Sequence, residues 1–284
     1  MNRWVAGARP RTLPAAVVPV VVGTAVASVD GEVVLWRAAC ALAVALAIQV
    51  GTNYANDYSD GVRGTDAERV GPMRLVGSGL ASPAAVKRAA LAAYAVAALA
   101  GLALALVVGP ELVVVGLASF AAGWLYTGGP RPYGYAGLGE LFVFVFFGVV
   151  ATAGSAYVHL DQVTVFALVA SIPVGLLATS LLVVNNLRDI DGDERAGKRT
   201  LAVRVGEPQT RSTYVGCIAF AFASVLYLAV GRLGALAGLL ALPLAVAPVR
   251  AVVRGDRGPS LIAVLGATGR LQLVFGLLLA AGIV

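Results

Sequence analysis

Residues 184–200 read VNNLRDIDGDERAGKRT, and they begin where the apolar run FALVASIPVGLLATSLLVV of residues 166–184 ends. An apolar run of about 20 residues is long enough to cross the hydrocarbon core of a bilayer as a helix. The stretch that follows carries three aspartates, one glutamate and four arginine or lysine residues. Such a concentration of both charges at the end of a membrane-length segment is the first candidate for a functional site.

The composition of the whole chain indicates a membrane protein. Hydrophobic residues make up 59% of the 284 residues, charged residues make up 13%, and the mean hydropathy is +0.87, which excludes a water-soluble domain. The apolar runs are unbroken rather than alternating, which favours helices over barrel strands. We therefore predict an all-α fold, a polytopic bundle of nine transmembrane helices that forms one intramembrane domain over residues 1–284. The predicted helices cover residues 12–29, 36–55, 89–108, 111–127, 139–158, 164–187, 212–231, 233–252 and 261–283.

The distribution of positive charge predicts the orientation of this bundle. With nine spans, the N-terminus and the loops after the second, fourth, sixth and eighth helices share one side. Of the 21 Lys and Arg residues, 18 lie on that side when Arg250, at the end of the eighth span, is included. The positive-inside rule places this side in the cytoplasm. Because the arginine-rich composition is typical of a GC-rich bacterial genome, we expect the bacterial cytoplasmic (inner) membrane. Topology and anionic lipid explain the net charge of +6, so we expect no nucleic-acid partner.

A cleaved signal peptide is the alternative interpretation of the N-terminus. Arg3, Arg9 and Arg11 precede an apolar run that ends in Ala25-Val26-Ala27, and this pattern also fits a cleavage site. Cleavage would keep the charged loops on the cytoplasmic side. Charge alone therefore does not decide between the two interpretations.

The cysteines and the histidine are placed where they do not form a site. Cys40 and Cys217 lie within predicted spans, and the single histidine, His159, lies in an outer loop. This distribution gives neither a disulfide framework nor a Cys/His zinc site. Any metal must therefore be bound by oxygen.

An internal repeat links two distant parts of the chain. The second predicted span ends in QVGTNYANDYSDGVRGTD (residues 49–66), and the sixth ends in LLVVNNLRDIDGDERAGKRT (residues 181–200). Each carries an asparagine, an aspartate four residues later and a further aspartate. The two sets are Asn53, Asp57 and Asp60, and Asn185, Asp189 and Asp193. On a helix, offsets of three and four residues put such side chains on one face.

The two clusters predict a magnesium-bridged diphosphate site at the cytoplasmic ends of the second and sixth helices. Four carboxylates close together repel one another unless positive charge lies between them. Magnesium prefers carboxylate, amide and water oxygens, and it often completes its shell with phosphate oxygens. Arginine and lysine in the adjoining loops would bind a phosphate. These cations are Arg63, Arg69 and Arg74 near the first cluster, and Arg188, Arg195, Lys198 and Arg199 near the second.

The paired motifs, NxxxDxxD and NxxxDxxxD, resemble those of the UbiA-type intramembrane aromatic prenyltransferases. Three further stretches resemble the branch of that family that acts on 1,4-dihydroxy-2-naphthoate in menaquinone synthesis. They are ARPRTLPAAVVPVVVG (residues 8–23), NDYSDGVRGTD with GPMRLVGSG (within 56–79) and YTGGPRPYGYAGLGE (residues 126–140). Since the first of these belongs to the family fold, the resemblance implies that the N-terminal segment is retained rather than cleaved.

The resemblance also implies a reaction. Enzymes of this family bind a polyprenyl diphosphate through Mg²⁺ and ionise its allylic carbon–oxygen bond, and the electron-rich aromatic ring then attacks the cation. Metal and Arg or Lys charge would stabilise the departing diphosphate. A dry tunnel would shield the cation and hold the prenyl tail. In the naphthoate branch the prenyl group replaces the ring carboxyl, with loss of carbon dioxide and a proton, and gives demethylmenaquinone after oxidation of the quinol.

The resemblance assigns a role to each motif position. The metal shell would be Asn53, Asp57, Asp60, Asp66, Asn185, Asp189 and Asp193, with the aspartates at 57, 60, 189 and 193 catalytic. The diphosphate would meet Arg63, Arg74, Arg131, Arg188 and Lys198, and the aromatic substrate Arg9, Tyr126, Tyr135 and Glu140. Asp60 is the candidate proton acceptor. Because the first motif spaces its acids more closely than in some family members, Asp66 is expected to complete the shell.

Several alternatives stay open at this point. Helix caps and ordinary inside-positive charge explain either cluster taken alone. Another acceptor, such as 4-hydroxybenzoate, homogentisate or haem, would keep the metal shell and change only the ring pocket. A secondary transporter can also show a repeat with intramembrane acids, although its site usually lies near the bilayer midplane. Arg270, inside the ninth predicted span, is not explained by these interpretations: it would either point toward the site or extend to the cytoplasmic interface. Neither prenyl length nor oligomeric state is predicted.

Overall fold

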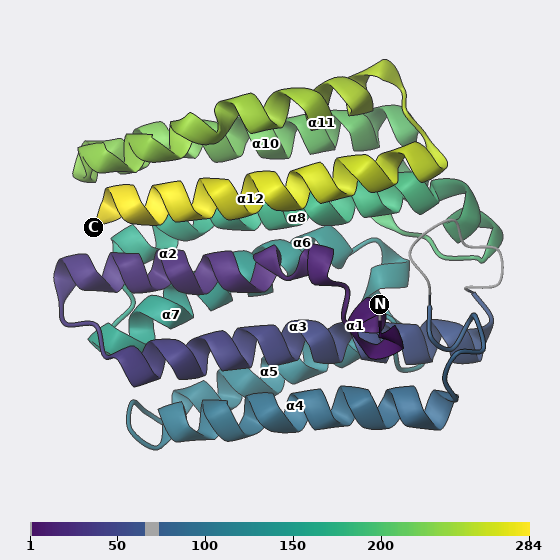
Figure 1. Cartoon of the computed structure of the whole chain (residues 1–284), viewed down its shortest axis with the longest axis horizontal. Helices are drawn as coiled ribbons and strands as arrows, with labels where there is room; N and C mark the ends of the chain where they lie inside the picture. Colours follow the sequence, from purple (N-terminus) through teal and green to yellow (C-terminus); the bar gives the residue numbers. More distant parts are fainter. Residues whose placement is uncertain (1, 66–73) are drawn as a thin grey trace.

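The computed structural model describes residues 2–65 and 74–284, and within these ranges every regular element is helical. The long helices run roughly parallel to one another (Figure 1). In chain order the elements are α1 (Arg3–Ala8), η1 (Pro10–Thr12), α2 (Pro14–Asp30), α3 (Leu35–Arg63), α4 (Pro83–Ala105), α5 (Glu111–Leu125), η2 (Tyr133–Ala136), α6 (Gly139–Val143), η3 (Phe144–Val150), α7 (Ala151–Leu160), α8 (Val165–Arg195), α9 (Leu201–Val205), α10 (Glu207–Gly231), η4 (Leu233–Ala241), α11 (Leu242–Arg254), η5 (Gly258–Ser260) and α12 (Leu261–Ile283).

The membrane-spanning character of this bundle is clear from length and hydropathy. In the described part of the chain, seven helical segments are long and apolar enough to cross a membrane. An eighth is present if α1 and η1 form one broken span with α2, to which they are bent by 51°. The remaining apolar helix, α5, is shorter. The all-α membrane bundle is therefore confirmed, whereas the count of nine spans stays a prediction.

The two motif helices extend beyond their apolar parts. We predicted ends at residues 55 and 187, but α3 continues to Arg63 and α8 to Arg195. Gly64, at φ 73°, ends α3 in the left-handed conformation that glycine adopts most readily. Hydropathy marks where apolar side chains stop rather than where backbone hydrogen bonding stops, so it misses these polar turns. The motif aspartates consequently lie on helix and not in loops.

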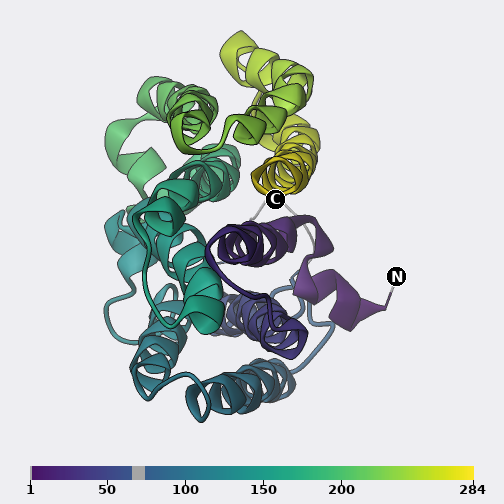
Figure 2. The same ribbon diagram turned by 90° about the vertical axis from the view of Figure 1, so that its left-hand side faces the viewer.

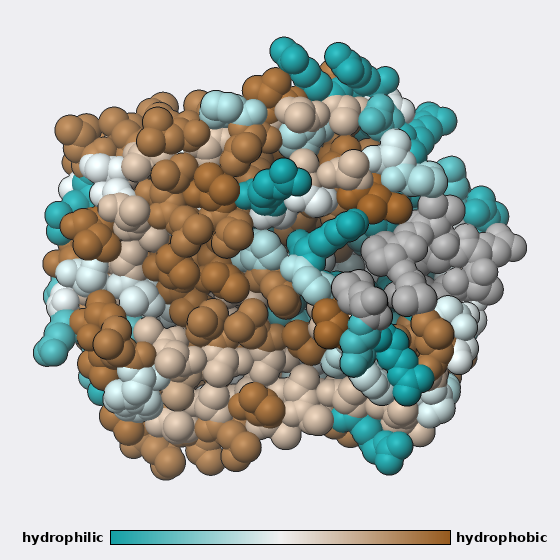
Figure 3. Space-filling model, viewed as in Figure 1, coloured by the Kyte–Doolittle hydropathy of each residue, from teal (hydrophilic) through white to brown (hydrophobic). Residues whose placement is uncertain are grey.

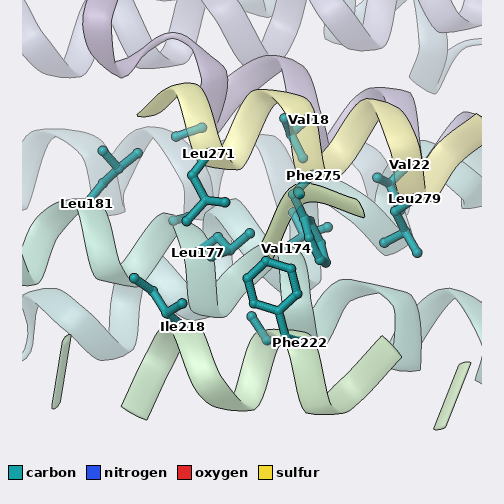
Figure 4. Packing of buried hydrophobic residues seen from close by; sticks show 14 of the residues in the cluster. Val18, Val22, Val174, Leu177, Leu181, Ile218, Phe222, Leu271, Phe275 and Leu279 are labelled. Carbon is teal, nitrogen blue, oxygen red and sulfur yellow. The ribbon is translucent and has the colours of Figure 1, made fainter. Parts of the chain in front are cut away.

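The main hydrophobic core joins α2, α8, α10 and α12. Figure 4 shows Val18, Val174, Phe222 and Phe275 among the side chains that meet there. Viewed end-on, α2 lies between the α3–α5 group and the group formed by α8 and α10–α12 (Figure 2). Because α2 lies between these two groups of helices, it can pack against both of them.

A close helix crossing brings η3 against α8. A Cβ added at Gly148 would lie 2.5 Å from the Cα of Gly175, so only glycine permits this approach. Small residues at helix contacts are typical of packing within membranes, where the backbones come close together. The outer surface is largely apolar over the middle of the helices (Figure 3), as expected for a surface in contact with lipid.

Candidate active site

A cavity of about 530 Å³ lies between the helices, and its lining changes from apolar to polar along two of them. On α3, residues from Ala41 to Ile48 give way to Gln49, Asn53 and Asp60. On α8, Leu181 and Leu182 give way to the motif residues. The rest of the lining includes apolar side chains of α4, α5 and α7. The cavity therefore suits a molecule with one polar end and a long apolar part.

The cavity brings most of the predicted site residues together. Those that line it are Arg9, Asn53, Asp60, Arg74, Tyr126, Tyr135, Asn185, Asp189, Asp193 and Lys198. The two halves of the internal repeat thus contribute to one site.

Asp60 has three donor partners among the described residues, and its side chain is almost wholly buried. It accepts a hydrogen bond of 2.6 Å from the Tyr135 hydroxyl, and its other oxygen lies 3.2 Å from the Lys198 ammonium. A guanidinium nitrogen of Arg74 lies 3.5 Å from the same oxygen. Burying a carboxylate is costly unless it is paired and hydrogen-bonded, and these three donors meet that requirement.

Tyr135 connects the η2 segment to this charge cluster. Its ring lies 5.0 Å from the Lys198 ammonium and 5.4 Å from the Arg63 guanidinium, within cation–π range. Burial, and then the charge of Asp60, raise the pKa of the Tyr135 phenol far above its ordinary value. The hydroxyl therefore stays protonated and can donate to Asp60 at any physiological pH.

On α8, Arg188 holds the carboxylate of Asp189 by two hydrogen bonds. Its Nε and Nη2 donate to the two carboxylate oxygens at 2.8 and 2.6 Å, and Nη2 also donates to Asn185 Oδ1 at 2.8 Å. Among the described residues Arg188 is not part of the cavity wall, whereas Asn185 and Asp189 are. Arg188 thus orients two motif oxygens, and its predicted contact with a diphosphate stays a prediction.

Asp57 faces a backbone rather than the cavity. Its carboxylate is fully buried and accepts hydrogen bonds from the amides of Leu75 and Val76, at 2.8 and 3.0 Å. It is not among the described residues that line the cavity. Asp57 therefore fixes the chain just after Arg74, and its role as a metal ligand stays a prediction.

Asn53 ties the N-terminal segment to α3. Its amide nitrogen donates to the Ala8 carbonyl at 3.0 Å and lies 3.4 Å from Thr12 Oγ1, which also accepts from Gln49 at 3.0 Å. Since Asn53 lines the cavity, these hydrogen bonds hold both the Asn53 side chain and the N-terminal segment in place at the cavity wall.

The other predicted residues lie around the cavity. Arg63 donates to the carbonyls of Thr127 and Gly129, and exposed Arg131 lines no part of the cavity. Glu140 is buried behind Asn186, from whose amide it accepts a hydrogen bond of 2.9 Å. Asp66 and Arg69 lie outside the described residues.

Sequence reasoning missed two amides of the polar wall. Asn56 accepts a hydrogen bond of 2.9 Å from Thr127, and Asn186 donates to Glu140; both line the cavity. Asn56 directly precedes Asp57, and Asn186 directly follows Asn185. Their positions next to motif residues could have indicated that they belong to the site.

The oxygen atoms that line the cavity are of the chemical type that a hard divalent cation prefers. Carboxylates of Asp60, Asp189 and Asp193 and amides of Asn53 and Asn185 face one cavity. In residues 2–65 and 74–284, however, no group of three His, Cys, Asp or Glu side chains is close enough to hold a metal ion. Lys198 lies between two of the carboxylates instead, 3.2 Å from Asp60 and 4.0 Å from Asp193.

Known proteins resemble this chain along nearly its whole length. The sequence profile of the UbiA prenyltransferase family matches residues 16–265. A 1,4-dihydroxy-2-naphthoate octaprenyltransferase of Mycobacterium tuberculosis is 51% identical, with 99% of this chain and 96% of that protein covered. The Escherichia coli protein of the same name is 37% identical over 88% of this chain and 85% of its own length. A UbiA homologue from Archaeoglobus fulgidus, solved with GPP and Mg²⁺, has a TM-score of 0.67 at 13% identity and covers 99% of this chain and 100% of that one.

Proposed function

Because the chain belongs to the UbiA prenyltransferase family, we infer that it transfers a polyprenyl group from polyprenyl diphosphate to 1,4-dihydroxy-2-naphthoate. Carbon dioxide and diphosphate leave, and the product is demethylmenaquinol, which oxidises to demethylmenaquinone. The observation that carries this inference is the 51% identity to a naphthoate octaprenyltransferase over 99% of the chain. The cavity agrees with it, because its polar and apolar parts match a diphosphate and a prenyl tail.

The polar wall would bind the diphosphate. The allylic carbon–oxygen bond breaks, and its electron pair leaves with the diphosphate. Lys198 and Arg74 both lie beside Asp60 on the cavity wall, and they would stabilise that negative charge as it develops. The apolar length of the cavity would exclude water from the allylic cation.

We propose Mg²⁺ as the cofactor of this step. Asp60, Asp189, Asp193, Asn53 and Asn185 would hold it, and it would supply Lewis-acid stabilisation of the diphosphate. The Archaeoglobus fulgidus homologue has the same fold and was solved with GPP and Mg²⁺ bound, which supports this assignment.

The acceptor ring would then form the new bond. A ring carbon attacks the allylic carbon, and the bond from that ring carbon to the carboxyl breaks, so that its electron pair returns to the ring as carbon dioxide leaves. The proton of the carboxyl group is already lost when that group ionises, so the carboxylate leaves as carbon dioxide without a further proton transfer. Asp60 has three donor partners and is poorly suited to accept one. Its role as general base stays a prediction, although the reaction does not require it.

The location follows from the helices and the charge distribution. The chain is a multi-pass membrane protein. We propose that it forms a single intramembrane domain in the bacterial inner membrane, with the N-terminus and the polar end of the cavity on the cytoplasmic side, where 18 of the 21 Lys and Arg residues are predicted.

The test is prenyl transfer by purified protein in detergent, with 1,4-dihydroxy-2-naphthoate, a polyprenyl diphosphate and Mg²⁺. We expect demethylmenaquinone in the wild type, none after chelation of the metal, and a strong loss in Asp189→Asn. Transfer to 4-hydroxybenzoate or homogentisate but not to naphthoate would overturn the acceptor. Flux of a solute into liposomes without diphosphate release would overturn the enzyme in favour of a transporter.

A further inference from the structure

Two exposed arginines have no role in the proposed reaction. Arg11 belongs to η1, and Arg270 lies in the membrane-spanning helix α12. Within the described ranges neither guanidinium forms a hydrogen bond or ion pair with another residue. A rise of 1.5 Å per residue puts Arg270 about 14 Å along α12 from Leu261, well inside the apolar part of the helix.

The two arginines lie at the same level of the bundle. A Cβ added at Gly269 would lie 2.8 Å from the carbonyl oxygen of Arg11, so the backbone of η1 rests directly on α12 beside Arg270. Hydrophilic side chains interrupt the apolar surface over α12 and the N-terminal segment (Figure 3). The surface where η1 meets α12 thus carries two exposed arginines whose backbones lie close together.

The stretches of chain that carry these two arginines contain no acidic residue. Residues 2–29 and 257–284, which include α1, η1, α12 and nearly all of α2, contain neither Asp nor Glu. An unpaired arginine within a transmembrane helix is energetically costly. A second positive charge beside it raises this cost, unless an anion lies between the two.

The segment that precedes Arg11 carries residues that are typical of a membrane–water interface. The Arg3 guanidinium lies 5.6 Å from the ring centre of Trp4 on α1, and Trp with Arg is typical of a membrane–water interface. Since α1 and η1 are bent by 51° from α2, this interfacial segment runs beside the bundle and leads straight to Arg11.

We propose that Arg11 and Arg270 form a binding site for the phosphate group of a membrane amphiphile, on the surface where η1 meets α12. Arginine suits phosphate because its planar fork donates two parallel hydrogen bonds. The phosphate has two possible sources: a phospholipid headgroup, or the diphosphate of the prenyl substrate before it enters the cavity. The second source rests on the proposed function and is consistent with Arg9, which lines the cavity two residues away.

The test compares Arg11→Gln/Arg270→Gln with Arg250→Gln. Arg250 is an exposed arginine on α11, and it serves as a control because it belongs to neither η1 nor α12, the two elements that would form the site. Delipidated protein is titrated with phosphatidylglycerol, and bound lipid is counted by native mass spectrometry. The KM for polyprenyl diphosphate is measured in nanodiscs, and thermal unfolding checks that all variants fold.

We expect about tenfold weaker binding of one phosphate ligand in the double variant, the size of one lost charge-assisted hydrogen bond. Weaker lipid binding at unchanged KM identifies the headgroup, and a raised KM at unchanged lipid binding identifies the substrate diphosphate. If both quantities match those of the control, the site does not exist. If the wild type transfers no prenyl group to naphthoate, the proposed function fails while the lipid titration still decides the site.

Discussion

The ammonium group of Lys198 lies 3.2 Å from the carboxylate of Asp60, although the two residues come from opposite halves of the chain. Asp60 is on α3, and Lys198 follows α8, the helix that carries the second motif. Lys198 also lies 4.0 Å from Asp193. One lysine therefore joins the two repeated motifs at the polar end of the cavity.

Replacing Lys198 by Met should remove both this connection and a positive charge from the diphosphate end. A charge-assisted contact is worth about 1.5–3 kcal/mol, so kcat/KM should fall roughly 10- to 100-fold. Steady-state kinetics with both substrates measures the change. Lys87→Met alters the other lysine of the chain, which is exposed on α4, and should keep wild-type kinetics. Equal effects of the two changes would show that Lys198 has no special role.

Tyr135→Phe should keep the ring beside Lys198 and Arg63 and remove only the hydroxyl that donates to Asp60. We expect about a tenfold lower kcat/KM, because one hydrogen bond to a charged group is lost. Tyr135→Leu, which also removes the cation–π contacts, should lower it further. An unchanged rate in Tyr135→Phe together with a large loss in Tyr135→Leu would assign the effect to the ring alone.

The pH dependence of the wild type should show no ionisation of Tyr135. Burial and the charge of Asp60 raise the pKa of this phenol, so its protonated, donating form persists above the ordinary tyrosine pKa of about 10. Activity should therefore not decline through this group up to roughly pH 10. An alkaline decline below that pH in the wild type that is absent from Tyr135→Phe would contradict the raised pKa.

Asp57→Ala should lower the stability of the fold, and this effect should not depend on whether Asp57 binds the metal. The change leaves the buried amides of Leu75 and Val76 without their acceptor, which costs about 1–3 kcal/mol of unfolding free energy. Thermal unfolding should show a lower midpoint for Asp57→Ala than for Asp189→Asn. An unchanged midpoint for Asp57→Ala, with a higher Mg²⁺ requirement, would instead support Asp57 as a direct ligand.

Filling the apolar part of the cavity should shorten the longest prenyl group that is used. Gly154 on α7 lines the cavity, and a Cβ there would meet no atom within 4 Å, so Gly154→Leu adds a side chain into open space. Competition between short and long polyprenyl diphosphates, with product analysis by mass spectrometry, measures the preference. Gly216→Leu on α10 is also free of close neighbours but lies outside the cavity wall, and it should leave the preference unchanged.

The sequence was sufficient to predict the helical membrane bundle and the pairing of two motifs. Helical periodicity puts Asn185, Asp189 and Asp193 on one face, and all three do line one cavity with Asn53 and Asp60. Unbroken apolar runs identify the spans, although they end α3 and α8 too early because the polar turns remain helical.

The direction of individual side chains was beyond sequence reasoning. The periodicity treats Asp57 and Asp60 alike, yet Asp57 faces the amides of residues 75 and 76 while Asp60 faces the cavity. Arg63 likewise binds two backbone carbonyls, whereas Lys198 reaches across to α3. These outcomes depend on which loop packs against which helix, and no local pattern contains that information.

The pairing of Asp60 with Lys198 also sets when the polar end of the cavity can first form during synthesis of the chain. The second member of the pair is translated well over a hundred residues after the first. At about 5–20 residues per second, the nascent chain waits on the order of ten seconds with Asp60 in place and its cation still to be made. The polar end of the cavity thus stays incomplete on the ribosome until about two thirds of the protein has been synthesised.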